Sequence, residues 1–261
     1  MILLERFVRW TGLRSGTKPE RSFPAALWDE TLAHLPFLDR LNAEEKARLK
    51  HLAGHFLAEK EFTGAGGLEL TDAICVSIAA QACLPILNLG LGHYTGWVGI
   101  VVYPDEFVIP RVVEDEAGVV HEYDDHVSGE AWEGGPVLVS WKDAEMAGEG
   151  YNVVIHEFAH KLDMRDGSAD GVPPLPPDIP VDEWNAVFLG AFHDFQASFS
   201  KVSETHAGND DGFDEYAATA PEEFFAVMSE VFFEKPGFLH NEFPALYALF
   251  SRFYRQDPAH G

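Results

Sequence analysis

Two histidines in the segment VVIHEFAHKLD, residues 153–163, have the spacing of ligands to a single metal ion. Residues four apart on an α-helix lie about 40° apart around the helix axis and about 6 Å apart along it. His156 and His160 therefore point to the same side of a helix, where both imidazoles can reach one Zn²⁺. Glu157 lies beside such an ion, where its carboxylate can accept a proton from a water molecule that the metal acidifies. The H-E-x-x-H pattern predicts zinc-dependent hydrolysis with Glu157 as the general base.

A catalytic zinc site normally has three protein ligands and one water molecule, so a third ligand is needed. Asp166 follows His160 by six residues, as in an extended zinc-protease motif, but that motif has a glycine where Asp163 stands here. Glu223 lies in a later helical pattern, PEEFFAVMSEVFFEK, on a face that it shares with Glu230 and with the apolar Val227, whereas Glu222 points elsewhere. We favour Glu223 as the third ligand and keep Asp166 as the alternative.

Several residues around these candidates have positions typical of helix ends. Asn152 is a suitable N-cap for the H-E-x-x-H helix, and Thr219 with Pro221 is a suitable start for the helix of Glu223. Asp163 lies three residues after His160 on the ligand side. It can either orient a ligating imidazole or cap the end of the helix. The sequence leaves both roles open.

The elements that must position these residues follow from the hydrophobic periodicity. From about Ala25 to Leu91 the period is helical, and LNAEEKARLKHLAGHFLAEKEF has Asn42 as N-cap and Glu45 at the third helical position. The very apolar TDAICVSIAAQACLPILNLG begins at Thr71 or Asp72, ends near Gly90 and predicts a buried core helix rather than a membrane span.

The period shortens to that of strands between Trp97 and Trp141, in WVGIVVYP, GVVHEYDD and GPVLVSW. We predict a small, mostly antiparallel sheet there. Helical patterns return from Tyr151 onward, in the H-E-x-x-H segment, DEWNAVFLGAFHDFQASFSKV, PEEFFAVMSEVFFEK and PALYALFSRFY. The proline-rich segment between the first two, GSADGVPPLPPDIP, is expected to be an ordered loop or a lid. The fold class is therefore α+β.

At 261 residues the chain suits one domain of ordinary size. We expect an N-terminal arm over residues 1–24 and a single peptidase domain over 25–261. That domain divides into a helical part, 25–95, and a catalytic core, 96–261. The arm carries several basic residues and is expected to be a solvated or loosely docked tail.

The composition limits the partners of this chain. With 18 Lys and Arg against 43 Asp and Glu, the net charge is −25, which disfavours binding to nucleic acid and to anionic membranes. Cys75 and Cys83 are too far apart on one helix to form a disulfide, as expected for a cytoplasmic protein.

A second group, His121, Glu122 and His126, imitates a metal site in the acidic segment before the H-E-x-x-H helix. The two histidines are five residues apart, a spacing that places them on opposite faces of a strand. We expect exposed residues near a hairpin, in a region whose strands can pair with an extended substrate.

A resemblance to a known family extends beyond the five residues of the H-E-x-x-H pattern. It is carried by four longer segments: HEFAHKLDMRDG, DEYAATAPEEFFAVMSEVFF, ACLPILNLGL and FYRQDP. Together they resemble the Mlc titration factor A family of bacterial zinc peptidases, over about Leu35 to Pro258. The resemblance implies a zincin-like, gluzincin-type core similar to the peptidase domain of anthrax lethal factor. It also implies aminopeptidase action on short peptides.

Carried over by position, the resemblance makes His156, His160 and Glu223 the ligands of one Zn²⁺ per chain and Glu157 the general base. It assigns Tyr216 as the donor of a hydrogen bond to the tetrahedral oxyanion. The family name also suggests a different function, a protein-binding factor that sequesters a transcriptional repressor and in which peptidase activity is secondary. Peptide substrates and a repressor protein are therefore the expected partners.

Overall fold

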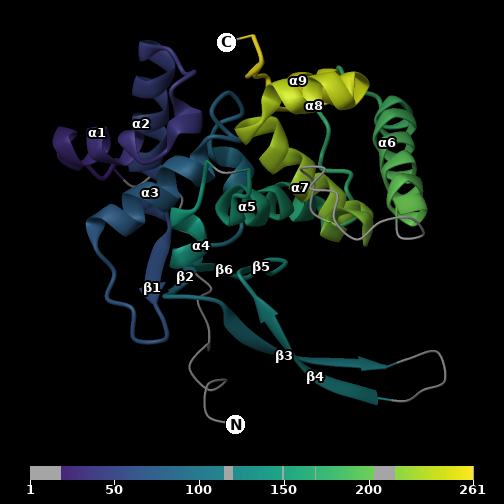
Figure 1. Ribbon diagram of the computed structural model, residues 1–261. Coiled ribbons are helices and arrows are strands. Elements are labelled where there is room, and N and C mark those ends of the chain that lie inside the picture. Colours follow the sequence, from purple (N-terminus) through teal and green to yellow (C-terminus); the bar gives the residue numbers. More distant parts are fainter. Residues whose placement is uncertain (1–18, 115–119, 149, 168, 203–214, 261) are drawn as a thin grey trace.

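The helix that carries the H-E-x-x-H residues lies at the centre of the fold. The computed structural model describes residues 19–114, 120–148, 150–167, 169–202 and 215–260. Helix α5 (Val153–Asp163) is buried along its whole length. The side chain of Asn152 accepts a hydrogen bond from the Ile155 N–H at 2.9 Å, which confirms the predicted N-cap. Figure 1 shows α5 between the sheet and the C-terminal helices.

A four-stranded sheet supports α5 from one side. Its strand order is β1-β2-β6-β5, formed by β1 (Glu61–Gly64), β2 (Gly99–Tyr103), β6 (Val137–Ser140) and β5 (Gly129–Ala131). Strand β2 pairs in parallel with both β1 and β6, whereas β5 pairs antiparallel with β6. Strand β5 is the edge strand that contacts α5.

The prediction of a mostly antiparallel sheet is wrong for this sheet, where two of the three strand pairings are parallel. One parallel pair, β2–β6, joins strands that residues 104–136 separate in the chain. The other pair involves strand β1, which lies inside the region predicted to be helical. Its four residues, EFTG, are too few to show an alternating pattern. Because helix α3 (Asp72–Cys83) connects β1 to β2, the two strands run in the same direction.

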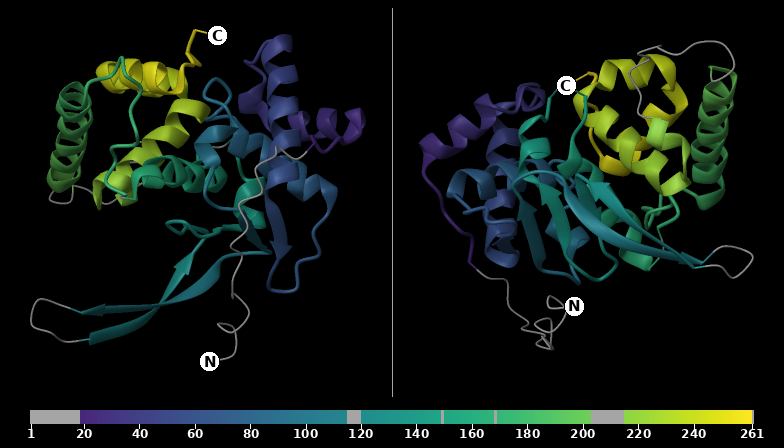
Figure 2. Two further views of the ribbon diagram at one scale, coloured as in Figure 1. Left: turned by 180° about the vertical axis from the view of Figure 1, so that it is seen from behind. Right: turned by 60° about the horizontal axis from the view of Figure 1, so that its bottom comes forward.

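The remaining two strands form a separate antiparallel ribbon from β3 (Phe107–Glu114) and β4 (Val120–Val127). Figures 1 and 2 show this ribbon projecting from the sheet beneath the C-terminal helices. His121, Glu122 and His126 are exposed on β4, and their alternation along the strand places the two histidines on opposite faces. The prediction that this trio is an exposed group near a hairpin is confirmed.

The N-terminal half packs helices against the sheet and α5. They are α1 (Ala25–Ala33), α2 (Ala43–Glu59), α3 and the short α4 (Trp141–Glu145), with 3₁₀ turns at Pro36–Leu38 and Leu91–Tyr94. Asn42 and Glu45 form the predicted capping box at the start of α2. Most of the predicted arm, residues 1–18 of 1–24, lies outside the described residues.

Helix α3 is a buried core helix, as predicted, with Thr71 as its N-cap. It ends at Cys83 rather than near Gly90, because Pro85 has no N–H to continue the helical hydrogen bonds. Among the described residues, no helix combines the length and the apolar character that crossing a membrane requires.

The C-terminal half covers the other side of α5 with an aromatic core. Its helices are α6 (Val181–Val202), α7 (Pro221–Glu234), α8 (Pro236–Glu242) and α9 (Pro244–Tyr254), with 3₁₀ turns at Met164–Asp166 and Glu215–Ala218. Trp184 stacks on Phe188 and Phe250, and contacts Phe225 and Phe253 through its edges and tilted rings. These ring contacts join α6, α7 and α9, and α7 in turn packs against α5, which brings α7 side chains to the H-E-x-x-H helix.

Candidate metal centre

Helix α5 brings His156 and His160 together as their spacing predicts. Their Nε2 atoms lie 3.2 Å apart, and the two rings meet nearly edge to face. Both side chains are largely buried, with 9% and 7% of their residue surfaces exposed. Two imidazole nitrogens therefore converge on one point at the wall of a pocket.

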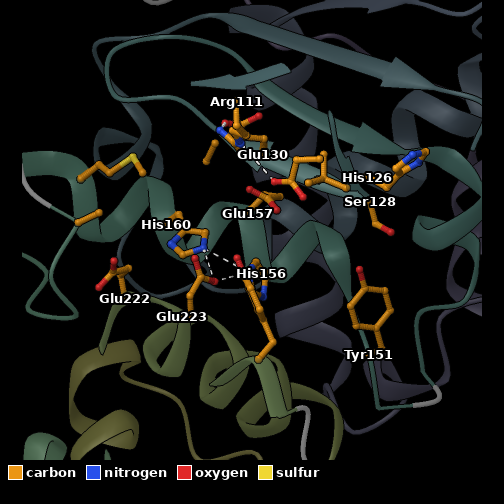
Figure 3. Close-up of a pocket in the computed structure, with 17 residues that line it drawn as sticks. Arg111, His126, Ser128, Glu130, Tyr151, His156, Glu157, His160, Glu222 and Glu223 are labelled. Carbon is orange, nitrogen blue, oxygen red and sulfur yellow. Dashed lines mark hydrogen bonds and ion pairs between the residues drawn. The ribbon is translucent and has the colours of Figure 1, made fainter. Parts of the chain in front are cut away.

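Glu223 of α7 completes a triangle with these two nitrogens. Its Oε2 atom lies 3.2 Å from Nε2 of His156 and 3.3 Å from Nε2 of His160. Ligand atoms of a tetrahedral zinc ion, at about 2.0–2.1 Å from the metal, lie about 3.3 Å from one another. The three ligand atoms thus have the separation and the chemical types of a three-residue zinc site, and Figure 3 shows them converging.

Glu223 reaches this position because it lies in the first turn of α7. Pro221 is the first residue of the helix, and the residues after Glu223 are fully buried against the core. The predicted N-cap, Thr219, is wrong: the N-cap residue is Ala220, and it makes no side-chain cap. The Thr219 hydroxyl instead donates to the carbonyl of Tyr216, within the preceding 3₁₀ turn.

Asp166, the alternative third ligand, lies elsewhere. It is exposed in the 3₁₀ turn after α5 and does not line the pocket that contains the two histidines. The chain continues from α5 into this turn without the glycine that the extended motif needs to fold back.

Glu230 is a functional residue whose role the sequence did not reveal. One carboxylate oxygen lies 2.7 Å from Nδ1 of His156, and the other accepts the Asn152 N–H at 2.6 Å. An acceptor at Nδ1 fixes the imidazole so that Nε2 presents its lone pair to the metal position. Its sequence signal was weak: Glu230 shares a helix face with Glu223, two turns further along α7.

Hydrogen bonds within this cluster shift the pKa values of His156 and Glu223 in opposite directions. Burial by itself lowers the pKa of His156, but hydrogen bonds with Glu223 and Glu230 outweigh it and raise that pKa well above its usual value. Burial disfavours an ionised Glu223, yet hydrogen bonds with the two histidines outweigh it and hold the pKa of Glu223 well below its usual range. The carboxylate is therefore ionised, as a metal ligand must be.

Glu157 points into the same pocket from the next position on α5, between the histidines and Glu130 in Figure 3. Only 4% of the residue is exposed, and its Oε2 has no hydrogen-bond partner among the described residues. Burial raises the pKa of Glu157 to about 7, against the opposing effect of His156 and His160. A carboxyl group with this pKa can both accept and return a proton near neutral pH.

Tyr216 lies at the rim of the pocket in the 3₁₀ turn before α7, with half of the residue exposed. Its ring centroid is 6.3 Å from that of His156. Partial burial and the negative charge of Glu223 both raise the pKa of the Tyr216 hydroxyl, which therefore stays protonated and able to donate.

Asp163 fixes a loop. Its Oδ2 accepts the Gly171 N–H at 2.8 Å, and the Gly171 carbonyl accepts the indole N–H of Trp184 at 2.9 Å. Within the described residues, Nδ1 of His160 has no hydrogen-bond partner, so the imidazole-orienting role considered for Asp163 is not formed. Asp163 thus attaches the proline-rich segment after α5 to the core.

The pocket has a volume of about 450 Å³ and lies between α5, α7 and the chain that leads from β4 into β5. Its wall opposite the histidines is acidic, with Asp125 and Glu130. Both carboxylates bind Arg111, at 3.2 and 2.7 Å. The site therefore combines a metal-ligating triangle, a poised carboxyl group and space for a small substrate.

This combination of a central helix with two histidines, a glutamate from a second helix and a buried carboxyl group is typical of metallopeptidases. A family model described as "Glucose-regulated metallo-peptidase M90" matches residues 9–255. The chain belongs to this family.

Proteins named "Mlc titration factor A" are its relatives. The protein from Salmonella arizonae is 42% identical over 236 residues, covering 89% of this chain and 92% of that protein. The protein from Enterobacter sp. is 38% identical over 254 residues, covering 96% and 92%. The protein from Serratia proteamaculans is 41% identical over 237 residues, covering 89% and 88%.

Proposed function

We propose that this metallopeptidase binds one Zn²⁺ through His156, His160 and Glu223 and hydrolyses peptide bonds with Glu157 as the general base. The observation that carries the proposal is the triangle of ligand atoms, with sides of 3.2 to 3.3 Å, beside the buried carboxyl group of Glu157, whose Oε2 has no hydrogen-bond partner among the described residues. A purely structural zinc site has four protein ligands and needs no base, so this arrangement favours catalysis.

The chain's own residues have the following roles. A zinc ion in this site supplies Lewis-acid activation of a water molecule and of the peptide carbonyl group. Glu157 takes a proton from the attacking water and passes it to the nitrogen of the leaving amine. Tyr216 donates its hydroxyl proton in a hydrogen bond to the oxyanion that develops on the carbonyl oxygen. Glu230 holds His156 in the tautomer that binds the metal.

We further propose that the enzyme acts as an aminopeptidase on short peptides. The acidic side chains of Asp125, Glu130 and Glu222 line the pocket with Glu157. Arg111 also lines the pocket and pairs with Asp125 and Glu130, but these four carboxyl groups outnumber it, so the pocket favours the positively charged α-ammonium group of a free peptide N-terminus. A short peptide with a free N-terminus should be hydrolysed at least tenfold faster than its N-acetylated form. Equal rates would indicate an endopeptidase.

A second function, the sequestration of a transcriptional repressor, is suggested by the name of the relatives. The β3–β4 ribbon exposes large apolar side chains, including Val112, Val120 and Tyr123, of the kind that protein-binding surfaces use. If binding is separate from catalysis, a Glu157→Gln variant should bind the repressor as tightly as the wild type. A large loss of binding would show that the two functions share the site.

The proposal also includes a domain assignment and a cellular compartment for this enzyme. We assign residues 25–261 to one zincin-like peptidase domain of the gluzincin type, preceded by an arm over 1–24. Cys75 and Cys83 are buried free thiols, which suits a reducing cytoplasm.

The direct test of the metal requirement is removal and replacement. Treatment with a chelator should abolish peptide hydrolysis, and one equivalent of Zn²⁺ should restore it, because the general base alone cannot activate water sufficiently. Full activity of the chelated, metal-free protein would overturn the proposal.

A further inference from the structure

A second histidine pair lies on the surface of α2, away from the pocket. His51 and His55 are four residues apart on this helix, and their Nε2 atoms are 3.2 Å apart. Nδ1 of His51 lies 2.8 Å from Oε2 of Glu20, which comes from the segment before α1. Among the described residues, two groups have ligand atoms close enough together to hold a metal ion. One is the triangle of His156, His160 and Glu223, and the other is this group of Glu20, His51 and His55.

The surface group repeats the geometry of the H-E-x-x-H histidines. The Nε2 atoms are 3.2 Å apart in both pairs, and the ring centroids are 4.6 Å apart in the surface pair and 4.8 Å apart in the buried one. In both pairs a carboxylate binds Nδ1 of the first histidine, Glu20 at 2.8 Å and Glu230 at 2.7 Å. A carboxylate at Nδ1 leaves the Nε2 lone pair free for a metal.

The chain is built to bring Glu20 to this place. The Arg21 N–H donates to the carbonyl of Gly54, which lies between the two histidines in sequence. A Cβ atom added at Gly54 would lie 2.6 Å from Cγ of Glu20 and 3.0 Å from the Arg21 carbonyl oxygen. Only glycine at this position lets the segment cross α2 so closely, and the crossing places the carboxylate against His51.

Two of the cations nearest in sequence are engaged in ion pairs, whereas Lys50, directly before His51, lies over the Phe23 ring with 5.7 Å between its Nζ and the ring centroid. Arg21 binds Asp72 at 2.9 Å, and Arg48, one turn before His51, lies 3.8 Å from Glu44. Their charges are therefore partly neutralised, and the net charge of −25 favours the approach of a cation.

We propose that His51 and His55 bind a divalent transition-metal ion through their Nε2 atoms, with Glu20 as the carboxylate that orients His51. Imidazole ligands suit Zn²⁺, Ni²⁺ and Cu²⁺, with Cu²⁺ bound most tightly. The residue after His51 is Leu52, not a glutamate, so this site holds a metal without a general base. Because His51 is exposed, the ion exchanges with solvent.

The site also joins two parts of the chain. Glu20 belongs to the segment that leads into α1, whereas both histidines belong to α2. A bound ion makes the imidazole of His51 a stronger hydrogen-bond donor to Glu20 and so strengthens the attachment of that segment to α2.

The experiment titrates Ni²⁺ into the full-length, zinc-loaded protein by calorimetry, while released zinc is monitored. The wild type should bind one further Ni²⁺ per chain without releasing zinc. The double variant His51→Asn/His55→Asn should lose this equivalent and keep its zinc and its peptidase activity. Glu20→Gln should bind the extra Ni²⁺ about tenfold more weakly.

The matched control is His121→Asn/His126→Asn, which removes two exposed histidines from β4 at a spacing unsuited to one ion. It should keep the additional Ni²⁺. The proposal is overturned if the wild type binds no further ion, if the His51/His55 double variant binds it as tightly as the wild type, or if the control loses it.

Discussion

Gly129 of the edge strand β5 lies so close to Glu157 that a Cβ atom added at residue 129 would sit 2.4 Å from the carboxylate Oε1. The same atom would be 2.7 Å from Cγ of Glu157 and 2.7 Å from Cγ2 of Val153. Glycine at this position of the strand therefore makes room for the proposed general base. The backbone of β5 and the carboxyl group of α5 form one wall of the pocket.

A Gly129→Ala variant should consequently lose activity while it keeps its metal. The added methyl group must displace the Glu157 side chain, whereas the three atoms nearest to it belong to Glu157 and Val153 and to none of the proposed metal ligands. Misplacing a catalytic group by about 1 Å costs on the order of 100-fold in rate. We expect kcat to fall about 10- to 100-fold, with one zinc still bound per chain.

Gly190→Ala is the control, because a Cβ atom there meets nothing within 4 Å, and it should leave kcat unchanged. Wild-type kcat in Gly129→Ala would contradict the close approach.

Glu230→Gln should weaken zinc binding, because the neutral side chain is a poorer acceptor for the His156 Nδ1–H. Loss of such a partner typically costs 10- to 100-fold in metal affinity, measurable by competition with a chromophoric chelator.

The control variant is Glu234→Gln, one turn further along α7. That carboxylate accepts the Gly148 and Gly150 N–H groups and contacts neither histidine, so its loss should lower the melting temperature and leave zinc affinity nearly unchanged. Equal zinc affinities in the two variants would argue against the orienting role.

Glu223→Ala should weaken zinc binding far more than Asp166→Ala. Glu223 places Oε2 within 3.3 Å of both histidine Nε2 atoms, whereas Asp166 is exposed outside the pocket. Zinc content after dialysis should fall well below one per chain in the first variant and stay near one in the second. The reverse order would transfer the third-ligand role to Asp166.

Asp163 should make the stability of the protein depend on pH. Burial raises the pKa of Asp163 from 3.8 to about 7 in the folded state, against the hydrogen bond from the Gly171 N–H. Between these two pH values the folded state holds a proton that the unfolded state has lost, so the free energy of unfolding falls as pH rises through this window. The slope is at most about 1.4 kcal/mol per pH unit.

The measurement compares denaturant unfolding of the wild type and Asp163→Asn at pH 5 and pH 8. Asparagine cannot ionise, so the stability of the variant relative to the wild type should rise by on the order of 2 kcal/mol between these two pH values. A difference that stays constant with pH would show that Asp163 is ionised in the folded protein throughout.

The sequence singled out the residues of the triangle by a local spacing for the two histidines and by the family resemblance and a helical pattern for Glu223. Spacing of four on one helix determines that His156 and His160 converge. A helix start with Pro221, a face shared with the apolar Val227 and the family resemblance selected Glu223, and the structure brings all three together. Helix α5 and the caps at Asn42 and Asn152 were likewise predicted, since capping depends on neighbouring residues.

What the sequence did not reveal depends on contacts between distant elements. The roles of Glu230 and Gly129 follow from how α7 and β5 pack against α5, which no local pattern encodes. Strand β1 was missed because four residues give too little periodicity, and the antiparallel prediction also failed for β2 and β6, which pair in parallel although the β3–β4 ribbon separates them in the chain. Thr219 looked like an N-cap, but its hydroxyl binds the preceding turn instead.

The most direct test of the proposed mechanism is to measure zinc content and peptide hydrolysis together in Glu157→Gln. Glutamine has nearly the same shape as glutamate but cannot accept the proton of the attacking water. We predict one zinc per chain, as in the wild type, and a rate of hydrolysis lower by about 10²- to 10⁴-fold. A variant that keeps its zinc and hydrolyses peptides at the wild-type rate would contradict the assignment of Glu157 as the general base.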